Sequence, residues 1–322
     1  VQFSVEDTID FFREIGIYPL NRNGYLYPRS NQAQSVVDVL CMEAASLGVK
    51  IKTNEQVTEI KPGKNGKNFR ILTKGWHYDA DSLILANGSK ASSVSGSDGS
   101  GYALAESLHH SIVPVYPALT ALKCKGSSFK AWAGVRTEGE ISLFTDGKFC
   151  KSERGELQLT EYGISGIPVF QISTYAVRAV REGHKAELRI NFMPELSEEE
   201  LRKLLYARKK ACPYKKEKEL LVGLFPEKLI KILISQKQLI SAIRDFPLEV
   251  QDGMSFSQAQ VCSGGVDTSQ VNSQTMESKL CKGLYFAGEL LDIDGTCGGY
   301  NLQWAWSSGA VAGRNAAKEE KK

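Results

Sequence analysis

The sequence contains no long hydrophobic run and no strong excess of one charge. No stretch of its 322 residues approaches the roughly 20 apolar residues of a membrane-spanning helix, so we expect no membrane segment. Its 40 basic and 37 acidic residues give a formal net charge of +3, which is too small to indicate a nucleic-acid partner. Apolar residues make up 42% and charged residues 24%, as in folded globular proteins.

The cysteines show neither a disulfide pattern nor a zinc pattern. They are odd in number and widely spaced, and no two form a CxxC pair; they are Cys41, Cys124, Cys150, Cys212, Cys262, Cys281 and Cys297. Zinc sites and disulfide frameworks use closely spaced or evenly paired cysteines. We therefore expect reduced thiols, no metal site and a cytoplasmic location.

The 29 glycines include no GxGxxG turn, which in dinucleotide-binding folds lets the backbone approach a pyrophosphate. The nearest cluster, Gly96, Gly99 and Gly101, has a different spacing. The chain starts at Val1, directly before a helical pattern that Ser4 can cap and Gly16 can end. From these observations we expect that a first βαβ unit is missing from this chain.

The next segments alternate between extended and helical patterns. Short strands are predicted at Tyr18–Leu20 and Tyr25–Tyr27, with Asn23-Gly24 as the turn between them. Ser30 is predicted to open a second helix, which ends at Gly48. In SLILANG, Leu83–Leu85 form a continuous apolar run, which is typical of a buried parallel strand.

The middle of the chain interrupts this α/β pattern. Residues 112–196 contain short alternating strands and one helix near Val169–Arg181, which predicts a small antiparallel β domain. Residues 197–253 follow as a helical region, and Ser197 and Glu200 have capping-box spacing. Residues 1–111 and 254–322 are predicted to form one α/β domain around this insertion.

The strongest chemical signal is the segment Gly283–Gly309, GLYFAGELLDIDGTCGGYNLQWAWSSG. A short buried strand leads to Gly288, where the missing side chain lets a ligand approach the backbone. Gly298 and Gly299 then open a helix at about Tyr300, whose first N–H groups are unpaired at the positive end of the helix dipole. Such a turn binds anions or stabilises negative charge that develops in a reaction.

A flavin fits this description, because its pyrimidine edge becomes anionic on hydride uptake. Backbone N–H groups of the new helix suit that edge, and nearby carboxylates can accept hydrogen bonds from ribityl or sugar hydroxyls. The cofactor-binding residues that we predict here are Gly288, Glu289, Asp292, Gly298, Gly299, Tyr300, Asn301 and Leu302. An ordinary strand-turn-helix with a glycine-rich turn is the alternative, and no catalytic acid or base is assigned.

This segment closely resembles the C-terminal FAD-binding motif of the HI0933-like flavoproteins, also described as YhiN/BaiN-type NAD(P)/FAD-dependent oxidoreductases. Three further segments, Asn23–Leu40, Ser82–Leu119 and Ser263–Leu280, resemble other family motifs in the same order. The resemblance implies a Rossmann-like FAD domain interrupted by a β-barrel-like domain with a small helical region. It also implies a flavin contact at Gly88, and hydride transfer from NAD(P)H through FAD to an organic acceptor. Reduction of a conjugated, sterol-like or other apolar carbon–carbon double bond is one possibility.

Two alternatives remain open. Similar FAD domains occur in flavin-dependent RNA-modifying enzymes, for which a basic cluster would be the RNA-binding face: Arg208, Lys209, Lys210, Lys215, Lys216 and Lys218. We interpret this cluster as a solvated helix surface, because glutamates flank it and no aromatic residues interleave it, and we expect a small-molecule substrate. The other alternative is a truncated, non-enzymatic fragment that binds a partner but no flavin.

Two departures from the family pattern lead to a first prediction. The GxGxxG turn is absent, and Asn87-Gly88-Ser89-Lys90-Ala91-Ser92 stands where the family usually has Gly-Gly and Ser-Tyr-Pro. Without the pyrophosphate turn, we expect this chain alone to bind FAD weakly. A visible absorption spectrum after incubation with excess FAD and desalting should then show little flavin, whereas a retained flavin spectrum would contradict this expectation.

Overall fold

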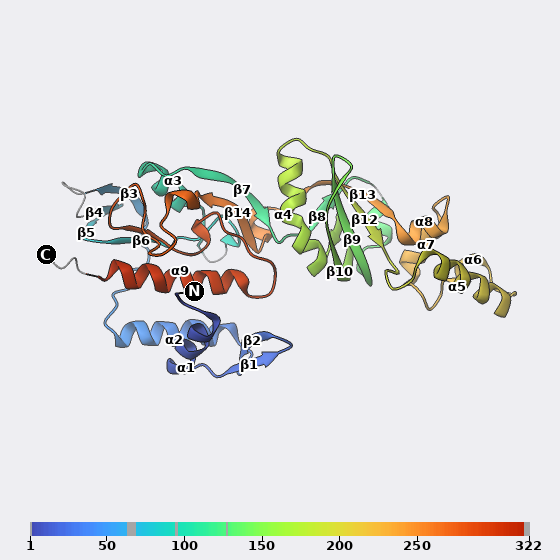
Figure 1. The fold of residues 1–322 in the computed structure, drawn as a ribbon, viewed down its shortest axis with the longest axis horizontal. Coiled ribbons are helices and arrows are strands. Elements are labelled where there is room, and N and C mark those ends of the chain that lie inside the picture. Colours follow the sequence, from blue (N-terminus) through green and yellow to red (C-terminus); the bar gives the residue numbers. More distant parts are fainter. Residues whose placement is uncertain (1, 63–68, 94–95, 127, 319–322) are drawn as a thin grey trace. The chain divides into compact units, whose positions relative to one another are not determined.

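The structure of the chain is a computed structural model that describes residues 2–62, 69–93, 96–126 and 128–318 (Figure 1). It consists of two compact units. Unit 1 comprises Val1–Lys90, Ser95–Val115 and Gly264–Lys322, and unit 2 comprises Ala91–Val94 and Tyr116–Ser263. From the sequence we placed the boundaries after residue 111 and before residue 254. The mixed α/β fold with an inserted barrel, predicted from the sequence, is confirmed.

Unit 1 contains most of the helices and strands from both ends of the chain. Its elements are α1 (Val5–Glu14), β1 (Pro19–Arg22), β2 (Tyr25–Pro28), α2 (Ala33–Ser46), β3 (Val57–Pro62), β4 (Phe69–Thr73), β5 (His77–Ala80), β6 (Leu83–Leu85), α3 (Ser100–Ser107), η5 (Thr268–Gln270), β15 (Leu284–Phe286), η6 (Gly288–Leu290) and α9 (Tyr300–Ala316). Two further strands, β7 (Ile112–Ala118) and β14 (Val261–Val266), pair with each other and carry the chain into unit 2 and back.

The centre of unit 1 is the parallel pair β6 and β15, in which Leu83, Ile84 and Leu85 lie opposite Leu284, Tyr285 and Phe286. The parallel strand predicted for SLILANG is therefore confirmed. Leu284 and Phe286 are fully buried, and α9 packs against both strands (Figure 1). Burial on both faces explains the apolar run of β15, whereas in β6 only Leu85 is buried and Ile84 is exposed, so the full burial expected for this strand is wrong.

The first helix packs on the last one. Ser4 caps α1 in a capping box with Asp7, as its position before the helical pattern predicted. Gln303 of α9 donates through Nε2 to the Thr8 hydroxyl at 2.8 Å, and the rings of Phe12 and Trp306 meet edge to face at 5.1 Å. These contacts fix the N-terminal segment to the long C-terminal helix.

The start of the second helix differs from the sequence prediction. The β1–β2 hairpin with its Asn23-Gly24 turn forms as expected, but α2 begins at Ala33 and not at Ser30. Gln32 occupies the capping position without a side-chain bond, and the Ser30 hydroxyl bonds Ser35 at 2.7 Å. Ser30 therefore stabilises the approach to the helix and does not cap it.

A three-stranded antiparallel sheet, in the order β3-β4-β5, completes unit 1. Its buried residues Ile60, Phe69 and Ile71 belong to the same core as Leu85, Tyr102 of α3 and Phe286. The alternation of apolar and polar residues in VTEIK and FRILT is typical of such half-buried antiparallel strands. One core thus joins the antiparallel sheet, α3, the parallel pair and α9.

Unit 2 is built around a closed barrel with the strand order β10-β11-β8-β13-β12-β9. Its elements are β8 (Leu122–Cys124), η3 (Ser128–Ala131), β9 (Val135–Thr145), β10 (Lys148–Thr160), β11 (Gly163–Ser165), α4 (Ile167–Arg181), β12 (Ala186–Asn191), α5 (Glu198–Ala211), α6 (Glu217–Leu220), α7 (Glu227–Ile234), α8 (Leu239–Arg244), β13 (Phe246–Gly253) and η4 (Phe256–Gln258).

Alternation along the strands fills the barrel. In β12, Ala186, Leu188 and Ile190 are buried while the residues between them are partly or fully exposed. Helix α4 packs against the barrel strands through fully buried residues such as Ile172 and Val177. The helical region opens at Ser197 and Glu200, whose predicted capping box is present. No helix among the described residues has the length and apolar character needed to cross a membrane.

A buried histidine makes the stability of unit 1 depend on pH. His110 is 3% exposed, its Nε2 lies 2.8 Å from the Ser278 hydroxyl, and its ring meets Phe286 edge to face at 4.8 Å. Within the described residues its Nδ1 has no hydrogen-bond partner. Burial lowers the pKa of His110, because a charged imidazolium is poorly solvated there.

We therefore expect the free energy of unfolding to be highest above the ordinary histidine pKa of about 6.5. It should decrease as the pH falls through the lowered pKa of the folded state. Thermal unfolding of His110→Gln across this range should show a weaker loss of stability in acid than the original chain. His109→Asn, at the exposed neighbouring position, is the control. An unchanged acid profile in His110→Gln would contradict this assignment.

Candidate functional site

The two glycine-containing loops predicted to bind a cofactor meet at one edge of the parallel pair. Residues 86–99 follow β6 and residues 287–299 follow β15, and the carboxyl ends of parallel strands lie at the same edge. The Ser89 hydroxyl donates to Glu289 Oε1 at 2.8 Å across 200 residues of sequence. Ser89 is almost fully buried, so this bond fixes one loop to the other.

Gly288 forms the sharp bend after β15. Its φ of +69° lies in the left-handed region, which glycine adopts without strain. Its N–H donates to the Ser308 hydroxyl at 2.9 Å, and its carbonyl accepts from Trp304 Nε1 at 3.0 Å. Both backbone groups of Gly288 are therefore bonded to α9. These two bonds hold the turn at Gly288 in place.

The two predicted carboxylates are also held by neighbouring groups. Glu289 accepts from Ser89, as described above, and Asp292 Oδ1 accepts from the backbone N–H of Gly264 at 3.0 Å. Both residues are half-buried. Their orientation is thus set by the chain itself.

Gly88 lies in the other loop, with a φ of +73°. A Cβ there would come within 3.1 Å of the Ser97 hydroxyl, and Ser97 in turn donates to the backbone carbonyl of Ser89. The loop continues to Gly99, which precedes α3 in a left-handed conformation. The described contacts of Gly88 hold the loop close to Ser89 and thereby close to Glu289.

The turn before α9 is braced by Asn301. The Asn301 side chain accepts from the N–H of Gly295 at 2.7 Å and donates to the carbonyl of Gly295 at 3.0 Å. This pair of bonds closes the turn over six residues. Gly298 and Gly299 follow with φ values of +118° and +93°, and the ring of Tyr25 packs directly against Gly298.

The amino end of α9 is open. No side chain caps the helix at Gly299, and a Cβ at Gly299 would find no atom within 4 Å. Tyr300 is 62% exposed and Leu302 is 61% exposed. The first N–H groups and the positive end of the 17-residue helix are therefore presented at an uncapped, accessible surface.

The cysteine in this turn has no features of a reactive thiol. Burial raises the pKa of the Cys297 thiol, which keeps it protonated and weakly nucleophilic at neutral pH. All seven cysteines are free. The described residues contain no group of three or more His, Cys, Asp or Glu side chains that could hold a metal ion.

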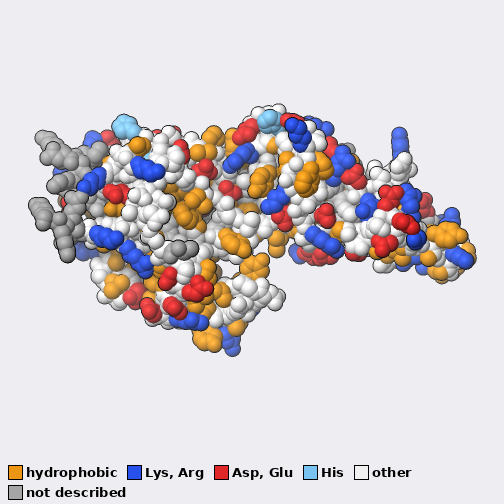
Figure 2. Space-filling view, in the orientation of Figure 1, with side chains coloured by type: hydrophobic (Ala, Val, Ile, Leu, Met, Phe, Trp, Pro, Cys, Tyr) orange, Lys and Arg blue, Asp and Glu red, His pale blue; other side chains and the backbone are white. Residues whose placement is uncertain are grey.

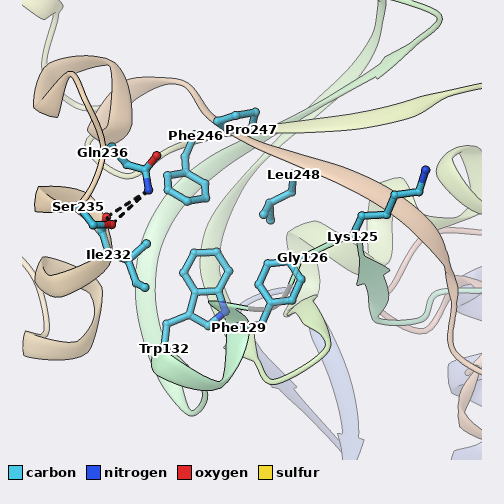
Figure 3. Close-up of a pocket in the computed structure, with 10 residues that line it drawn as sticks. All are labelled: Lys125, Gly126, Phe129, Trp132, Ile232, Ser235, Gln236, Phe246, Pro247 and Leu248. Carbon is cyan, nitrogen blue, oxygen red and sulfur yellow. Dashed lines mark hydrogen bonds between the residues drawn. The ribbon is translucent and has the colours of Figure 1, made fainter.

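A separate pocket lies in unit 2, between the barrel and α7 (Figure 3). Phe129, Trp132 and Phe246 form its aromatic wall, and Gln236 and Lys125 lie at its margin. Its volume of about 190 Å³ falls below the roughly 300–1,000 Å³ of typical ligand sites. Lys125 is paired with Glu249 at 2.6 Å. This pocket is too small for a multi-ring substrate.

The helical region that carries the basic cluster also carries acidic side chains. Arg208 donates to the carbonyls of Leu220 and Val222, both at 2.8 Å, and therefore braces the helices. Ion pairs one helical turn apart join Glu198 with Arg202 and Glu199 with Lys203. On the face in Figure 2, basic and acidic side chains are interspersed over these helices. The surface shown is mixed in charge.

Sequence reasoning missed three residues that shape the site: Ser89, Ser308 and Tyr25. Ser89 and Ser308 hold Glu289 and Gly288 by hydrogen bonds, and Tyr25 packs on Gly298. The spacing of Trp304 and Ser308 by four residues places both on one face of a helix, which could have indicated their shared role. No sequence signal links Tyr25 to Gly298.

Comparison with known proteins identifies the relatives of this chain. A family model described as the HI0933-like protein Rossmann domain matches residues 1–315. The chain is 43% identical over 334 residues to the 3-dehydro-bile acid delta(4,6)-reductase of Clostridium scindens, with 98% of this chain and 81% of that protein covered.

The chain is 29% identical over 296 residues to the ribosomal RNA dihydrouridine synthase of Haemophilus influenzae, with 86% of this chain and 71% of that protein covered. It is also 29% identical over 327 residues to the Escherichia coli protein of that name, with coverages of 95% and 78%. The family resemblance expected from the sequence is confirmed.

The brace at Asn301 gives a prediction for the turn. Asn301→Ala removes both bonds to Gly295, so we expect the free energy of unfolding to fall by about 1–3 kcal/mol and the amide of Gly295 to exchange faster with solvent. Asn315→Ala is the matched control, because it also removes two bonds near the other end of α9, one from Asn315 Nδ2 to the carbonyl of Val311 and one from Lys318 Nζ to Asn315 Oδ1. Equal exchange of the Gly295 amide in both variants would show that Asn301 does not brace the turn.

Proposed function

We infer a function from the family of this chain: it belongs to the HI0933-like proteins, a family of oxidoreductase type. We propose that it is a flavin-dependent reductase. In this proposal the overall reaction would add a hydride from NAD(P)H and a proton from solvent to a carbon–carbon double bond of an apolar organic acceptor. FAD, when bound, supplies the capacity to take up and release a hydride.

The observation that carries the proposal is the open amino end of α9. An uncapped helix start with accessible N–H groups favours a negatively charged or electron-rich ligand edge. The N–H groups of Tyr300, Asn301 and Leu302 would hold the pyrimidine edge of the flavin, and they would stabilise negative charge there without reorganisation. The left-handed Gly299, where a Cβ would meet no atom within 4 Å, leaves room for that approach.

The carboxylates and the second loop have supporting roles in this proposal. Glu289 and Asp292 are each oriented by a bond from the chain, and as carboxylates they would accept hydrogen bonds from ribityl or sugar hydroxyls. Gly88 would bring the loop after β6 against the cofactor, and Gly288 would shape the bend beside it. These assignments complete the nine positions predicted from the sequence.

The relatives support the choice of acceptor class. The relative at 43% identity is named for reduction of a bile acid, and the two at 29% are named for making dihydrouridine in ribosomal RNA. Both names describe hydrogen added to a double bond conjugated with a carbonyl group. The higher identity favours a steroid-like or other apolar conjugated enone over RNA, and the acidic side chains of the same helical region point the same way.

A direct test combines flavin titration with turnover. We expect saturable binding of FAD, measured as a change in the visible spectrum, and oxidation of NADH or NADPH that depends on both FAD and a conjugated steroid enone. A saturated steroid is the control acceptor. Turnover with ribosomal RNA and not with the enone would select the RNA alternative, and absence of FAD binding at saturating concentrations would remove the flavin proposal.

A charge placed at the start of α9 tests the proposed role of its N–H groups. Leu302→Asp adds a carboxylate beside the site, and we expect it to weaken FAD binding by roughly tenfold through repulsion of the electron-rich flavin edge. Leu302→Asn has nearly the same shape without the charge and should bind FAD much more tightly than Leu302→Asp. An acidic residue in the first turn is favourable for the helix itself, so loss of folding would not explain the difference. Equal affinities in the two variants would exclude this placement of the flavin.

A further inference from the structure

The β1–β2 hairpin presents an aromatic face beside the turn that opens α9. Tyr25 lies opposite Arg22, and Tyr27 lies opposite Leu20. Residues two apart on a strand share a face, as do residues directly opposite each other. Tyr25, Tyr27, Arg22 and Leu20 therefore form one face of the hairpin, and the guanidinium of Arg22 lies over the Tyr27 ring at 5.6 Å.

The contact between Tyr25 and Gly298 holds this face of the hairpin beside the turn that opens α9. A Cβ on Gly298 would lie 2.6 Å from Cε1 of the Tyr25 ring, a separation that real side chains do not adopt. The ring edge is thus in close contact with the backbone at Gly298, and only glycine accommodates it. Even so, Tyr25 remains 48% exposed, so about half of its surface is available to a ligand.

The contact lies close to the open end of α9. Gly298 precedes Tyr300 by two residues, and two residues span at most about 7 Å. The flavin ring system is rigid and has three rings. If it met the N–H groups of the first turn of α9, it would extend over the short segment from Gly298 to Tyr300. The exposed surface of Tyr25 is then within reach of the ring system, while the opposite edge of Tyr25 rests on Gly298.

We propose that Tyr25 contacts the flavin ring system and positions it at the amino end of α9. This inference rests on the proposed function and extends it to a residue of the hairpin. Aromatic rings in contact stabilise each other through offset or edge-to-face arrangements. The close fit against Gly298 holds the Tyr25 ring in one orientation, so little side-chain freedom is lost when the flavin binds. Tyr25 acts as a positioning residue and takes no part in the transfer of hydride.

Affinity for FAD gives the first test. Tyr25→Leu removes the ring, and we expect it to raise the Kd for FAD about two- to tenfold, measured by titration of the full protein. Tyr18→Leu is the matched control, because Tyr18 immediately precedes β1 and is 71% exposed. Tyr25→Phe keeps the ring and should bind FAD as the original protein does.

Fluorescence of the bound flavin gives a readout that a purely structural role would not change. A tyrosine in contact with a flavin quenches its emission by reversible electron transfer from the phenol in the excited state, and phenylalanine does not. Tyr25→Phe should therefore emit more strongly than the original protein at equal saturation with FAD. The comparison is made with Tyr27 and Tyr300 replaced by Phe, so that neighbouring phenols do not mask the effect.

The outcomes separate the two proposals. If FAD binds but Tyr25→Leu matches Tyr18→Leu in affinity and Tyr25→Phe leaves the emission unchanged, the role of Tyr25 is overturned and the proposed function stands. If the original protein binds no FAD, the proposed function fails, and the role of Tyr25 fails with it. Weaker binding in Tyr25→Leu together with stronger emission in Tyr25→Phe would establish the contact.

Discussion

The site depends on the parallel pairing of β6 with β15. These two strands of three residues each stand about 200 residues apart in the sequence, and their register brings both following loops to one edge. The bond from Ser89 to Glu289 then joins the loops directly. Because both partners of this bond come from loops that the strands deliver, a shift in strand register would separate them, and the glycine turns would no longer face a common ligand.

Helix α9 supports the site along several of its faces. Trp304 and Ser308, four residues apart, bond the two backbone groups of Gly288. Gln303 and Ser307, also four residues apart, bond the segment around α1, while Asn301 closes the preceding turn on Gly295. Spacing by four residues places side chains on a common face. Helix α9 therefore presents its open amino end and also holds the turns at Gly288 and Gly295 by hydrogen bonds.

Local patterns in the sequence predicted a large part of this architecture. The Asn23-Gly24 hairpin, the capping boxes at Ser4 and Ser197, and the start of α9 at Tyr300 each depend on interactions between residues close in sequence. Ser30 misled the prediction because a serine before a helix can bond several nearby groups, and here its hydroxyl bonds Ser35. The limits of α2 were therefore wrong at its start.

The remaining features depend on contacts that local patterns do not encode. The barrel closes with β8 between β11 and β13, an order that alternating hydrophobicity cannot specify. Ser89 and Tyr25 meet Glu289 and Gly298 only after the chain has folded. Eight of the nine predicted cofactor positions came from the residues of the Gly283–Gly309 segment and Gly88 came from the family resemblance, and sequence reasoning could not supply the groups that orient them.

The pairing of β7 with β14 has a consequence for how such a protein can diversify. The chain leaves unit 1 along β7 and returns along β14, and these strands are hydrogen-bonded neighbours. The pairing of β7 with β14 therefore keeps the two ends of the inserted segment next to each other. Such a segment can be lengthened, shortened or exchanged without moving the strands that flank it. The insertion can therefore change in length or sequence while the framework of unit 1 stays the same.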